Sequence, residues 1–572
     1  MSFERVPLDK FAETFAATTE LSSVALGGRI VAVSDEFFAE AFHLLLVEPA
    51  PSMKGQFGPN GALFSGWETR RHNPAYDWCI IQLGTTGTVI GFDVDTANFS
   101  GNEAPQVSID ALYAPPSEEP RVDDPRWTEV FPKTDMGPDS RHLFKIAPTS
   151  RVNYVKLNMY PDGGIGRFRV YGDVAPVHPE DQTSFDLAHI FAGGRVVHTS
   201  DQHFGVGANL ILPGRGKDMG DGWETKRSRA KGHNDWVVIK LGTPGFLEHV
   251  EIDTAHFKGN FPESGEMHAL YSEIDIDWKA QSTANLEWTP VLPRTKLGPH
   301  RQHYFQLENV EDTPYTHVKV TIHPDGGLKR VRVIGHRADI ADSSAKHLTE
   351  SIEEATKTMA TILSSKTSAC ASIKKTTVPV LPLTPEAFAA FGEVIQAYGD
   401  HTSAPKGTRI TPANAGTASK FHKLSLLSQT YAPEAKATAG ISVYRCKPLK
   451  DVTAEGTTDL TVLERHSFTN QAFIPMGRGV GEGLPDPAER YLVVVAKNGE
   501  NDHPDLQTVR AFVASTAQGV VYNTGIWHQP MTVLDKALDF ACVETQIGDG
   551  SVADCEILEL DVSANQITLK LP

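Results

Sequence analysis

The sequence contains few cysteines, and none of them are paired at a metal-binding spacing. The five cysteines in 572 residues are scattered, odd in number and without a Cys-x-x-Cys pair. This pattern argues against a disulfide framework and against a thiolate zinc site, and it favours a reducing compartment. We therefore expect a cytoplasmic protein. The cysteines are Cys79, Cys370, Cys446, Cys542 and Cys555.

Long apolar runs and an excess of positive charge are also missing. No window approaches the ~18 consecutive apolar residues of a membrane helix. The N-terminus lacks the basic and apolar regions of a signal peptide. The net charge of −18 disfavours nucleic acid and anionic membranes as partners. A small anionic substrate remains compatible, because a local arginine cluster can bind one.

The most informative feature that is present is a long internal repeat. Gly66–Thr69 recurs as Gly222–Thr225, and Pro161–Gly164 recurs as Pro324–Gly327. The offset of roughly 160 residues is too long for a solenoid repeat and matches a whole domain. The first part of the chain therefore contains two copies of one module.

Each copy has the pattern of an all-β module. Runs such as Asp77–Gly84 and Ile90–Asp95 are short, bounded by turn formers or alternating in polarity, which predicts separate strands. The Pro-Asp-Gly-Gly segments predict turns in which glycine supplies a positive φ. Many short strands with Gly/Pro turns indicate a jelly-roll β-sandwich for each copy.

The amino-acid composition of the chain changes after the second copy. Residues 338–377 are rich in Ala, Ser, Thr and Lys and lack aromatics, which predicts a linker that is partly helical. Thr384 and Pro385 then predict a helix start, with threonine as the cap. We expect sandwich repeats at 1–180 and 181–337, the linker at 338–377, and an all-β barrel at 378–572. Its expected strands are Gly440–Tyr444, Gln471–Ile474, Tyr491–Val495, Val509–Val513, Gly519–Tyr522 and Phe540–Glu544.

One loop in each repeat gathers charged and imidazole groups. The first copy has Glu68, Arg71 and His72 after Trp67, and the second has Glu224, Arg227 and, further on, His233. The tryptophans are expected in the core. The charged residues form either a structural pair or a site, since loops on rigid sheets are where sites concentrate. In the next loop Asn98 is replaced by His256, which serves either as a base or ligand or as a surface histidine.

The last domain carries two short motifs of a cupin-like barrel. Gly519–Pro530 resembles the second cupin motif and directs His528 into the lumen. In the first motif, Glu464 and Gln471 occupy places where a metal-binding cupin offers histidine and glutamate. A divalent metal ion, if one binds, would be held by Glu464, His466 and His528, because glutamine is a poor ligand. The alternative is that His528 is only a barrel-end histidine.

On these residues the chain resembles two enzyme families. The doubled pattern resembles allantoicase across about residues 20–337. Residues 378–572 resemble ureidoglycolate lyase through Gly440–Ser442, Glu464–His466, Gln471–Pro475 and Gly519–Pro530. Two positions depart from the lyase pattern: Lys420 stands where the family has arginine before Phe-His, and Tyr522-Asn523 stands where it tends to have histidine.

The resemblance implies a bifunctional enzyme of purine catabolism. It would hydrolyse allantoate to ureidoglycolate and urea, and then cleave ureidoglycolate to glyoxylate and urea. It would use small-molecule substrates and form a homo-oligomer. The alternative is a tandem β-sandwich protein that binds carbohydrate or another small ligand, with a non-catalytic cupin domain. The candidate catalytic residues are Glu68, His72, Glu224, His233, His256, Glu464, His466 and His528, and the candidate substrate-binding residues are Arg71, Arg227, Lys420, Arg465 and Gln471.

Overall fold

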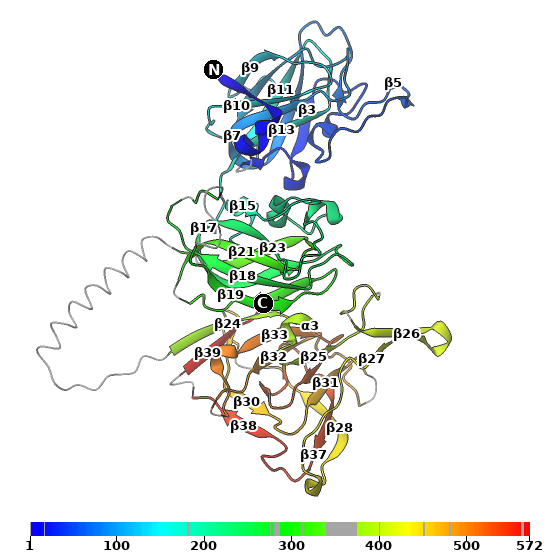
Figure 1. The fold of residues 1–572 in the computed structure, drawn as a ribbon, viewed down its shortest axis with the longest axis vertical. Helices are drawn as coiled ribbons and strands as arrows, with labels where there is room; N and C mark the ends of the chain where they lie inside the picture. The colour runs from blue at the N-terminus through cyan, green and yellow to red at the C-terminus, as the bar shows by residue number, and fades with distance from the viewer. Residues whose placement is uncertain are drawn as a thin grey trace, which may run out of the picture. The chain divides into compact units, whose positions relative to one another are not determined.

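The computed structural model describes residues 2–15, 18–179, 183–274, 276–278, 286–311, 313–338, 374–399, 401–405, 407–449, 452–479, 482–500, 502–561 and 565–572. Its contacts divide the chain into two compact units. The first holds the first repeat, and the second holds most of the second repeat and the C-terminal domain, so each module is described by itself. Figure 1 shows that strands dominate every module.

The first repeat is a β-sandwich with its core between the layers. Its buried side chains include Phe92, Phe131, Leu157 and Phe168. Trp67 is fully buried and its ring N–H donates to the carbonyl of Asp35 at 2.7 Å, which confirms that it is a core residue. The strands are β1 (Phe3–Val6), β2 (Thr19–Glu20), β3 (Arg29–Val33), β4 (Phe57–Gly58), β5 (Gly61–Ala62), β6 (Trp67–Glu68), β7 (Asp77–Asp95), β8 (Gln106–Leu112), β9 (Thr128–Asp135), β10 (Arg141–Ile146), β11 (Arg151–Tyr160), β12 (Gly164–Ile165) and β13 (Arg167–Val174).

Strand β7 corrects the expectation of two separate strands. It is continuous over nineteen residues, from Asp77 to Asp95. Its first half pairs with β3 and β11, and its second half pairs with β10 and β13. Side chains at Gly84 and Gly87 would collide with Leu26, Leu21 and nearby carbonyls, so glycine lets the strand pass through this crowded stretch.

The second repeat reproduces this architecture. Strand β17 is again a single nineteen-residue strand. The turns of the Pro-Asp-Gly-Gly segments are confirmed, with φ of 147° at Gly163 and 131° at Gly326. The strands are β14 (Phe185–Asp186), β15 (Arg195–Thr199), β16 (Trp223–Glu224), β17 (Asp235–Asp253), β18 (Ser264–Leu270), β19 (Thr289–Lys296), β20 (Gln302–Gln306), β21 (Tyr315–His323), β22 (Gly327–Leu328) and β23 (Arg330–Arg337).

The C-terminal domain is a cupin-like β-barrel, built among the described residues from a nine-stranded and a five-stranded sheet. Its interior packs Phe473, Phe512, Tyr522 and Phe540 from both sheets. All six strands expected from the sequence are present. The strands are β24 (Lys374–Pro382), β25 (Gly392–Ile395), β26 (Arg409–Ala413), β27 (Ala418–His422), β28 (Thr438–Cys446), β29 (Thr457–Asp459), β30 (Val462–Arg465), β31 (Gln471–Met476), β32 (Arg490–Ala496), β33 (Arg510–Ser515), β34 (Gly519–Tyr522), β35 (Trp527–His528), β36 (Thr532–Val533), β37 (Leu538–Gln546), β38 (Glu556–Glu559) and β39 (Asn565–Lys570).

Helices are short in all modules. The predicted helix start is confirmed: Thr384 caps α3 by accepting the N–H of Ala387, and Pro385 is the first helical residue. Residues 339–373 of the expected linker lie outside the described residues, and β24 already begins at Lys374. The helices are η1 (Leu8–Lys10), α1 (Phe11–Phe15), η2 (Val24–Leu26), η3 (Ala41–Leu45), η4 (Ile190–Ala192), η5 (Gly207–Ile211), η6 (Met219–Asp221), α3 (Pro385–Phe388), η8 (Asn414–Gly416), η9 (Pro433–Ala435) and η10 (Leu506–Thr508).

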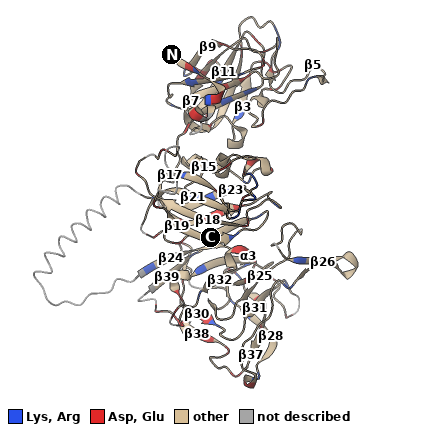
Figure 2. Ribbon diagram, in the orientation of Figure 1, with Lys and Arg blue, Asp and Glu red and all other residues tan. Residues whose placement is uncertain are grey.

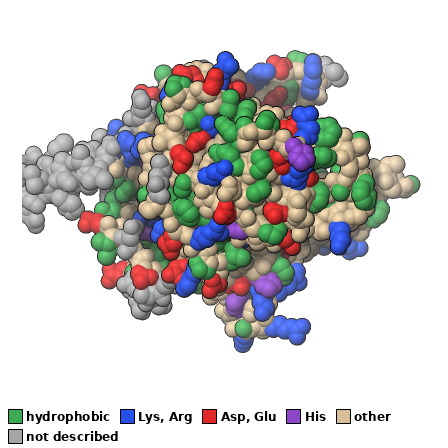
Figure 3. Space-filling view, turned by 90° about the horizontal axis from the view of Figure 1, so that it is seen from above, with side chains coloured by type: hydrophobic (Ala, Val, Ile, Leu, Met, Phe, Trp, Pro, Cys, Tyr) green, Lys and Arg blue, Asp and Glu red, His purple; other side chains and the backbone are tan. Residues whose placement is uncertain are grey.

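Acidic and basic residues are interspersed along the strands and loops (Figure 2). The face shown in Figure 3 mixes acidic, basic and hydrophobic side chains without one extended basic area. Within the described residues, no helix is both long enough and apolar enough to cross a membrane.

Candidate active sites

In the first repeat, the predicted residues Glu68 and Arg71 belong to a closed polar cluster. The Glu68 carboxylate accepts from Asn102 Nδ2 at 2.9 Å and lies 3.5 Å from the Arg71 guanidinium. Arg71 also pairs with Asp162 at 3.1 Å and donates to the Asn102 carbonyl at 3.0 Å. Burial raises the pKa of Glu68, against the lowering effects of the Asn102 hydrogen bond and the Arg71 charge. The Arg71 guanidinium is therefore already bound by groups of the protein.

The second repeat places the equivalent residues around a pocket of about 720 Å³. Glu224 again accepts from an asparagine, Asn260, at 2.6 Å. A pocket of this volume is within the range that holds small ligands. The lining combines one carboxylate, two imidazoles and three cationic side chains. It consists of His203, Phe204, Met219, Glu224, Lys226, Arg227, His256, Lys258, Gly259 and Asn260.

Arg227 differs from Arg71 in its partners. Within the described part of the chain, the Arg227 guanidinium makes no hydrogen bond or ion pair. The loop explains the difference. In the first repeat the backbone N–H of Asn73 donates to the turn aspartate, Asp162. In the second repeat the equivalent donor is Ser228, directly after Arg227, and it donates to Asp325. The first repeat thus has one extra residue, His72, which takes a φ of 66°.

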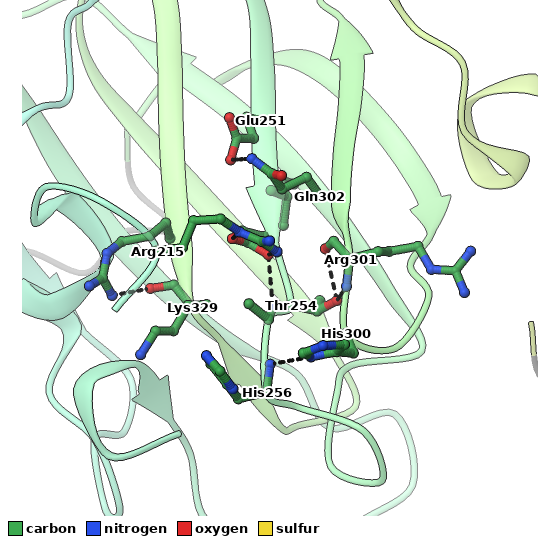
Figure 4. Close-up of polar contacts among 12 residues, drawn as sticks. Arg215, Glu251, Thr254, His256, His300, Arg301, Gln302 and Lys329 are labelled. Carbon is green, nitrogen blue, oxygen red and sulfur yellow. Dashed lines mark hydrogen bonds and ion pairs between the residues drawn. The ribbon is translucent and has the colours of Figure 1, made fainter. Parts of the chain in front are cut away.

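A second difference concerns the next loop. In the first repeat the N–H of Asn98 donates to Asp139, and its side chain donates to the Ala50 carbonyl. In the second repeat the N–H of His256 donates to His300 Nδ1 at 2.8 Å, as the dashed line in Figure 4 shows. Burial, then the charges of Lys258 and His256, lower the pKa of His300. The loop that holds the asparagine in one copy therefore directs an imidazole into the pocket in the other.

The loop that supplies Met219 to the pocket is anchored by a buried lysine. Lys329 Nζ pairs with Asp221 and donates to the Asp218 carbonyl, while Arg330 donates to the Asp221 carbonyl at 2.7 Å. Burial lowers the pKa of Lys329 to about 8. Gly166 takes the place of this lysine in the first repeat. This anchor is another feature found only in the second repeat.

The two remaining histidines predicted in the repeats lie apart from the pocket lining. His233 Nε2 contacts the Asp235 carboxylate at 3.0 Å, and Asp235 also accepts from Ser200. His72 lies in the first repeat. Asp162, Asn260 and Lys258 were not expected from the sequence, although the repeated Pro-Asp-Gly-Gly and Gly-Asn pairs point to the first two.

In the barrel, Glu464, His466 and His528 come together as predicted. One donor atom from each lies within 4.8 Å of the others. His528 Nε2 is 3.5 Å from Glu464 Oε1, and the two imidazoles stack with centroids 5.6 Å apart. The Tyr522 ring, which stands where the lyase pattern tends to have histidine, covers His528 at 3.9 Å.

The hydrogen bonds of the two histidines fix their tautomers. His466 Nδ1 contacts the Asp554 carbonyl at 2.6 Å, and His528 Nδ1 contacts the Ile526 carbonyl at 3.1 Å. A carbonyl only accepts, so both Nδ1 atoms carry the proton. Both Nε2 atoms are buried without a hydrogen-bond partner among the described residues. His528 Nε2 lies 3.5 Å from Glu464 Oε1, so a positive charge between these two atoms would satisfy both.

The charges of this cluster are set by burial and by mutual contacts. Burial raises the pKa of Glu464, but the 3.5 Å contact with His528 and the charges of His528 and His466 outweigh it, so the pKa is lowered. Burial, then the His528 charge, lower the pKa of His466. An ionised Glu464 and a neutral His466 follow. This donor set of one carboxylate and two imidazoles also suits a divalent transition metal.

Glu544 is a second buried carboxylate that sequence analysis missed. It accepts from Gln471 Nε2 at 2.9 Å and from the Cys542 thiol at 3.4 Å, and it lies 3.6 Å from His466 Nδ1. Gln471 thus orients a carboxylate beside the imidazoles. The alternation of Phe540, Cys542 and Glu544 on β37 is the sequence signal that could have indicated an inward-facing Glu544.

Lys420 and Arg465, the two cationic residues predicted to bind the carboxylate of the lyase substrate, lie away from the barrel histidines. Arg465 is bound by Asp502 at 2.6 Å, by Glu556 at 2.7 Å and by Asn498, and it covers the Trp527 ring. Lys420 is an exposed residue of the β26–β27 hairpin. The structure therefore does not bring Arg465 and Lys420 together with the three barrel residues.

Comparison with known proteins identifies the families of both parts of the chain. The allantoicase repeat family matches residues 19–175 and 185–338, and the ureidoglycolate lyase family matches residues 375–566. A probable allantoicase of Schizosaccharomyces pombe is 47% identical over 329 residues, covering 56% of this chain and 94% of that protein. Neurospora crassa allantoicase is 44% identical, covering 58% and 96%. A crystal structure of Saccharomyces cerevisiae allantoicase matches with a TM-score of 0.51 and 41% identity, covering 59% of this chain and all of that one.

Two sandwiches with carboxylate and cationic loops, followed by a barrel with buried imidazoles, define a hydrolase fused to a lyase. Both parts break C–N bonds of ureides. The chain belongs to the allantoicase family and carries a C-terminal ureidoglycolate lyase domain. It is a bifunctional enzyme of allantoin degradation: it hydrolyses allantoate to ureidoglycolate and urea, and it cleaves ureidoglycolate to glyoxylate and urea.

Proposed function

We propose that the pocket of the second repeat is the allantoate site and that the first repeat is the structural copy. The observation that carries this proposal is the Arg227 guanidinium, which has no polar partner among the described residues and lies beside Glu224 and His256 in a single pocket. Its counterpart Arg71 is paired with Asp162. A guanidinium binds a carboxylate through two parallel hydrogen bonds, and allantoate has one carboxylate.

Hydrolysis of allantoate needs a base for the water and a proton donor for the leaving urea. Glu224 takes one proton from water while the oxygen bonds to the central carbon of allantoate. The C–N bond breaks, and His256 supplies a proton to the departing nitrogen. Arg227 and Lys226 hold the substrate carboxylate, and Asn260 fixes Glu224 through the 2.6 Å hydrogen bond.

Replacing Arg227 by leucine tests where allantoate binds. Losing a charge-assisted contact of about 1.5–3 kcal/mol raises KM for allantoate roughly tenfold to a hundredfold. The matched control is Arg71→Leu, which disrupts the closed cluster, lowers Tm and leaves KM nearly unchanged. Initial rates of urea release against allantoate concentration check both variants. A rise in KM for Arg71→Leu alone would assign the substrate to the first repeat.

For the lyase step, His466 acts as base and His528 as acid. Neutral His466 Nε2 takes the hydroxyl proton of ureidoglycolate, the C=O bond forms, and the C–N bond to urea breaks. A proton held between His528 Nε2 and Glu464 Oε1, which lie 3.5 Å apart, is returned to the urea nitrogen. Glu544 and the Asp554 carbonyl orient His466. No water is consumed, as a lyase requires.

A divalent metal ion is the second candidate for the charge between these groups. Glu464 and the two Nε2 atoms of His466 and His528, which have no hydrogen-bond partner in the described part of the chain, are the ligands that would hold it. A bound cation would polarise the hydroxyl group and the carboxylate of the substrate. Glu464, His466 and His528 would then act as ligands of the ion rather than as proton carriers.

Metal analysis separates the two candidates. If the barrel holds a metal ion, purified chain retains about one equivalent after gel filtration, and chelation lowers the Tm of the lyase domain. A ligand present at a hundred times its Kd stabilises by about 2.7 kcal/mol. Glu464→Gln abolishes that shift, whereas Glu68→Gln retains it. A metal-free chain with full lyase activity and an unchanged Tm establishes the proton-transfer mechanism.

We also propose that the enzyme is a cytoplasmic homo-oligomer. The location is supported by the described cysteines, Cys79, Cys446, Cys542 and Cys555, which are all free thiols. The oligomer is supported by an exposed apolar sheet face on the barrel, which includes Ile441, Val443, Ile474 and Met476.

A further inference from the structure

The loop that carries His256 is held against a neighbouring loop in the same way in both repeats. In the second repeat, Thr254 Oγ1 donates to the Gly298 carbonyl at 2.6 Å. In the first repeat, Thr96 Oγ1 donates to the Gly137 carbonyl at 2.7 Å. The N–H of each threonine also donates, at 2.9 Å, to a second carbonyl of that neighbouring loop. The two copies therefore share one backbone frame at this place.

The residues at the tips of these two loops are exchanged as a pair between the repeats. The first copy has Asn98 and Asp139. The second copy has His256 and His300 at the same positions. All four take a positive φ, between 41° and 68°. In both copies the N–H of the first residue donates to the side chain of the second at 2.8 Å, so the contact is kept although both residues differ.

His300 accepts this hydrogen bond as a neutral ring. A backbone N–H only donates, so His300 Nδ1 keeps its lone pair and the proton of the ring is on Nε2. A second proton on Nδ1 would break the bond to His256. Burial, followed by the charges of Lys258 and His256, lowers the pKa of His300, which favours the same neutral form.

His300 also packs against the ring of the residue that it holds. The two imidazoles meet edge to face, with centroids 5.5 Å apart. Figure 4 shows the ring of His300 beside the backbone of His256. His256 belongs to the pocket lining, whereas His300 lies outside it. His300 therefore contacts His256 through both the backbone and the ring, without being part of the lining.

We infer that His300 is a positioning residue for allantoate hydrolysis: it fixes His256 where His256 gives its proton to the departing urea. The inference rests on the proposed assignment of the allantoate site to the second repeat and deepens it. Displacing a catalytic group by about 1 Å can cost roughly a hundredfold in rate. Since Arg227, rather than His300, holds the substrate carboxylate in that proposal, His300 acts on kcat and not on KM.

Replacing His300 by glycine tests this role in the full chain. Glycine removes the acceptor and the ring, and it suits the φ of 51°. The variant is expected to lower kcat for urea release from allantoate about tenfold to a hundredfold and to leave KM nearly unchanged. Asp139→Gly is the matched control, because it removes the equivalent acceptor in the first repeat, and it should retain the wild-type kcat. Equal losses of kcat in the two variants, or an unchanged kcat in His300→Gly, overturn the inference.

Replacing His300 by aspartate separates the lost acceptor from a general loosening of the loop. Aspartate accepts the same N–H in the first repeat, at a position that also has a positive φ. His300→Asp is therefore expected to return kcat to within about fivefold of the wild-type value. A His300→Asp variant as slow as His300→Gly contradicts a role for the acceptor and overturns the inference.

A double-mutant cycle tests whether His300 acts through His256. If it does, His300→Gly has no further effect on kcat in a His256→Ala background. Losses that multiply in the double variant overturn the inference. Glu224→Gln separates this result from the site assignment: full urea release by Glu224→Gln means that allantoate reacts elsewhere, and both proposals fail. An impaired Glu224→Gln together with an unimpaired His300→Gly removes only the role of His300.

Discussion

Replacing Glu224 by glutamine is expected to lower urea release from allantoate by two to four orders of magnitude, the usual contribution of a positioned base. The change keeps the shape of the side chain and the hydrogen bond from Asn260, so the pocket remains intact. Only the ability to accept a proton from water is lost. Urea measured during single-substrate turnover of allantoate reports the effect directly.

The internal repeat provides the control for this experiment. Glu68→Gln makes the same chemical change in the first copy, where the carboxylate also accepts from an asparagine. It is expected to leave the rate of allantoate hydrolysis within about twofold, because surrounding protein groups already satisfy this cluster. Equal losses in the two variants would show that both copies take part in the reaction and would reject the assignment to the second repeat.

Replacing His528 by asparagine is expected to remove glyoxylate release while preserving hydrolysis of allantoate. Asparagine keeps a polar group but supplies no proton at neutral pH, so the lyase rate falls by roughly two to four orders of magnitude. With allantoate as substrate, the variant releases half of the urea of the wild-type enzyme and accumulates ureidoglycolate. Parallel measurements of urea and glyoxylate check this.

His503→Asn serves as the control, because His503 is an exposed histidine of the same domain. It should match the wild-type enzyme in both products. Loss of both activities in His528→Asn would contradict independent active sites in the two parts of the chain. Retained glyoxylate release would remove His528 from the lyase reaction.

The fold was largely predictable because its signals are local. Thr384 and Pro385 mark a helix start through one capping contact, and Gly163 and Gly326 adopt the positive φ expected of their turns. The continuity of β7 was not predictable from its pattern of apolar and polar residues. Glycines inside the strand look like turn residues in sequence, whereas in the fold they admit close neighbours.

The sites were only partly predictable, because residue type does not reveal what a side chain contacts. Arg71 and Arg227 follow similar motifs. Arg71, in the repeat with the inserted residue His72, pairs with Asp162, whereas Arg227 has no polar partner among the described residues. Arg465 was a plausible carboxylate ligand until the fold placed Asp502 and Glu556 around it. Contacts of this kind join residues far apart in sequence, so they follow from tertiary structure alone.

The long strand β7 has a consequence for how the first sandwich opens. Its two halves pair with different neighbours, β3 and β11 on one side and β10 and β13 on the other. A single strand is thus hydrogen-bonded to both sets of neighbours, so loss of pairing at one half of β7 affects the other half. We therefore expect the module to unfold as a single cooperative unit rather than as two.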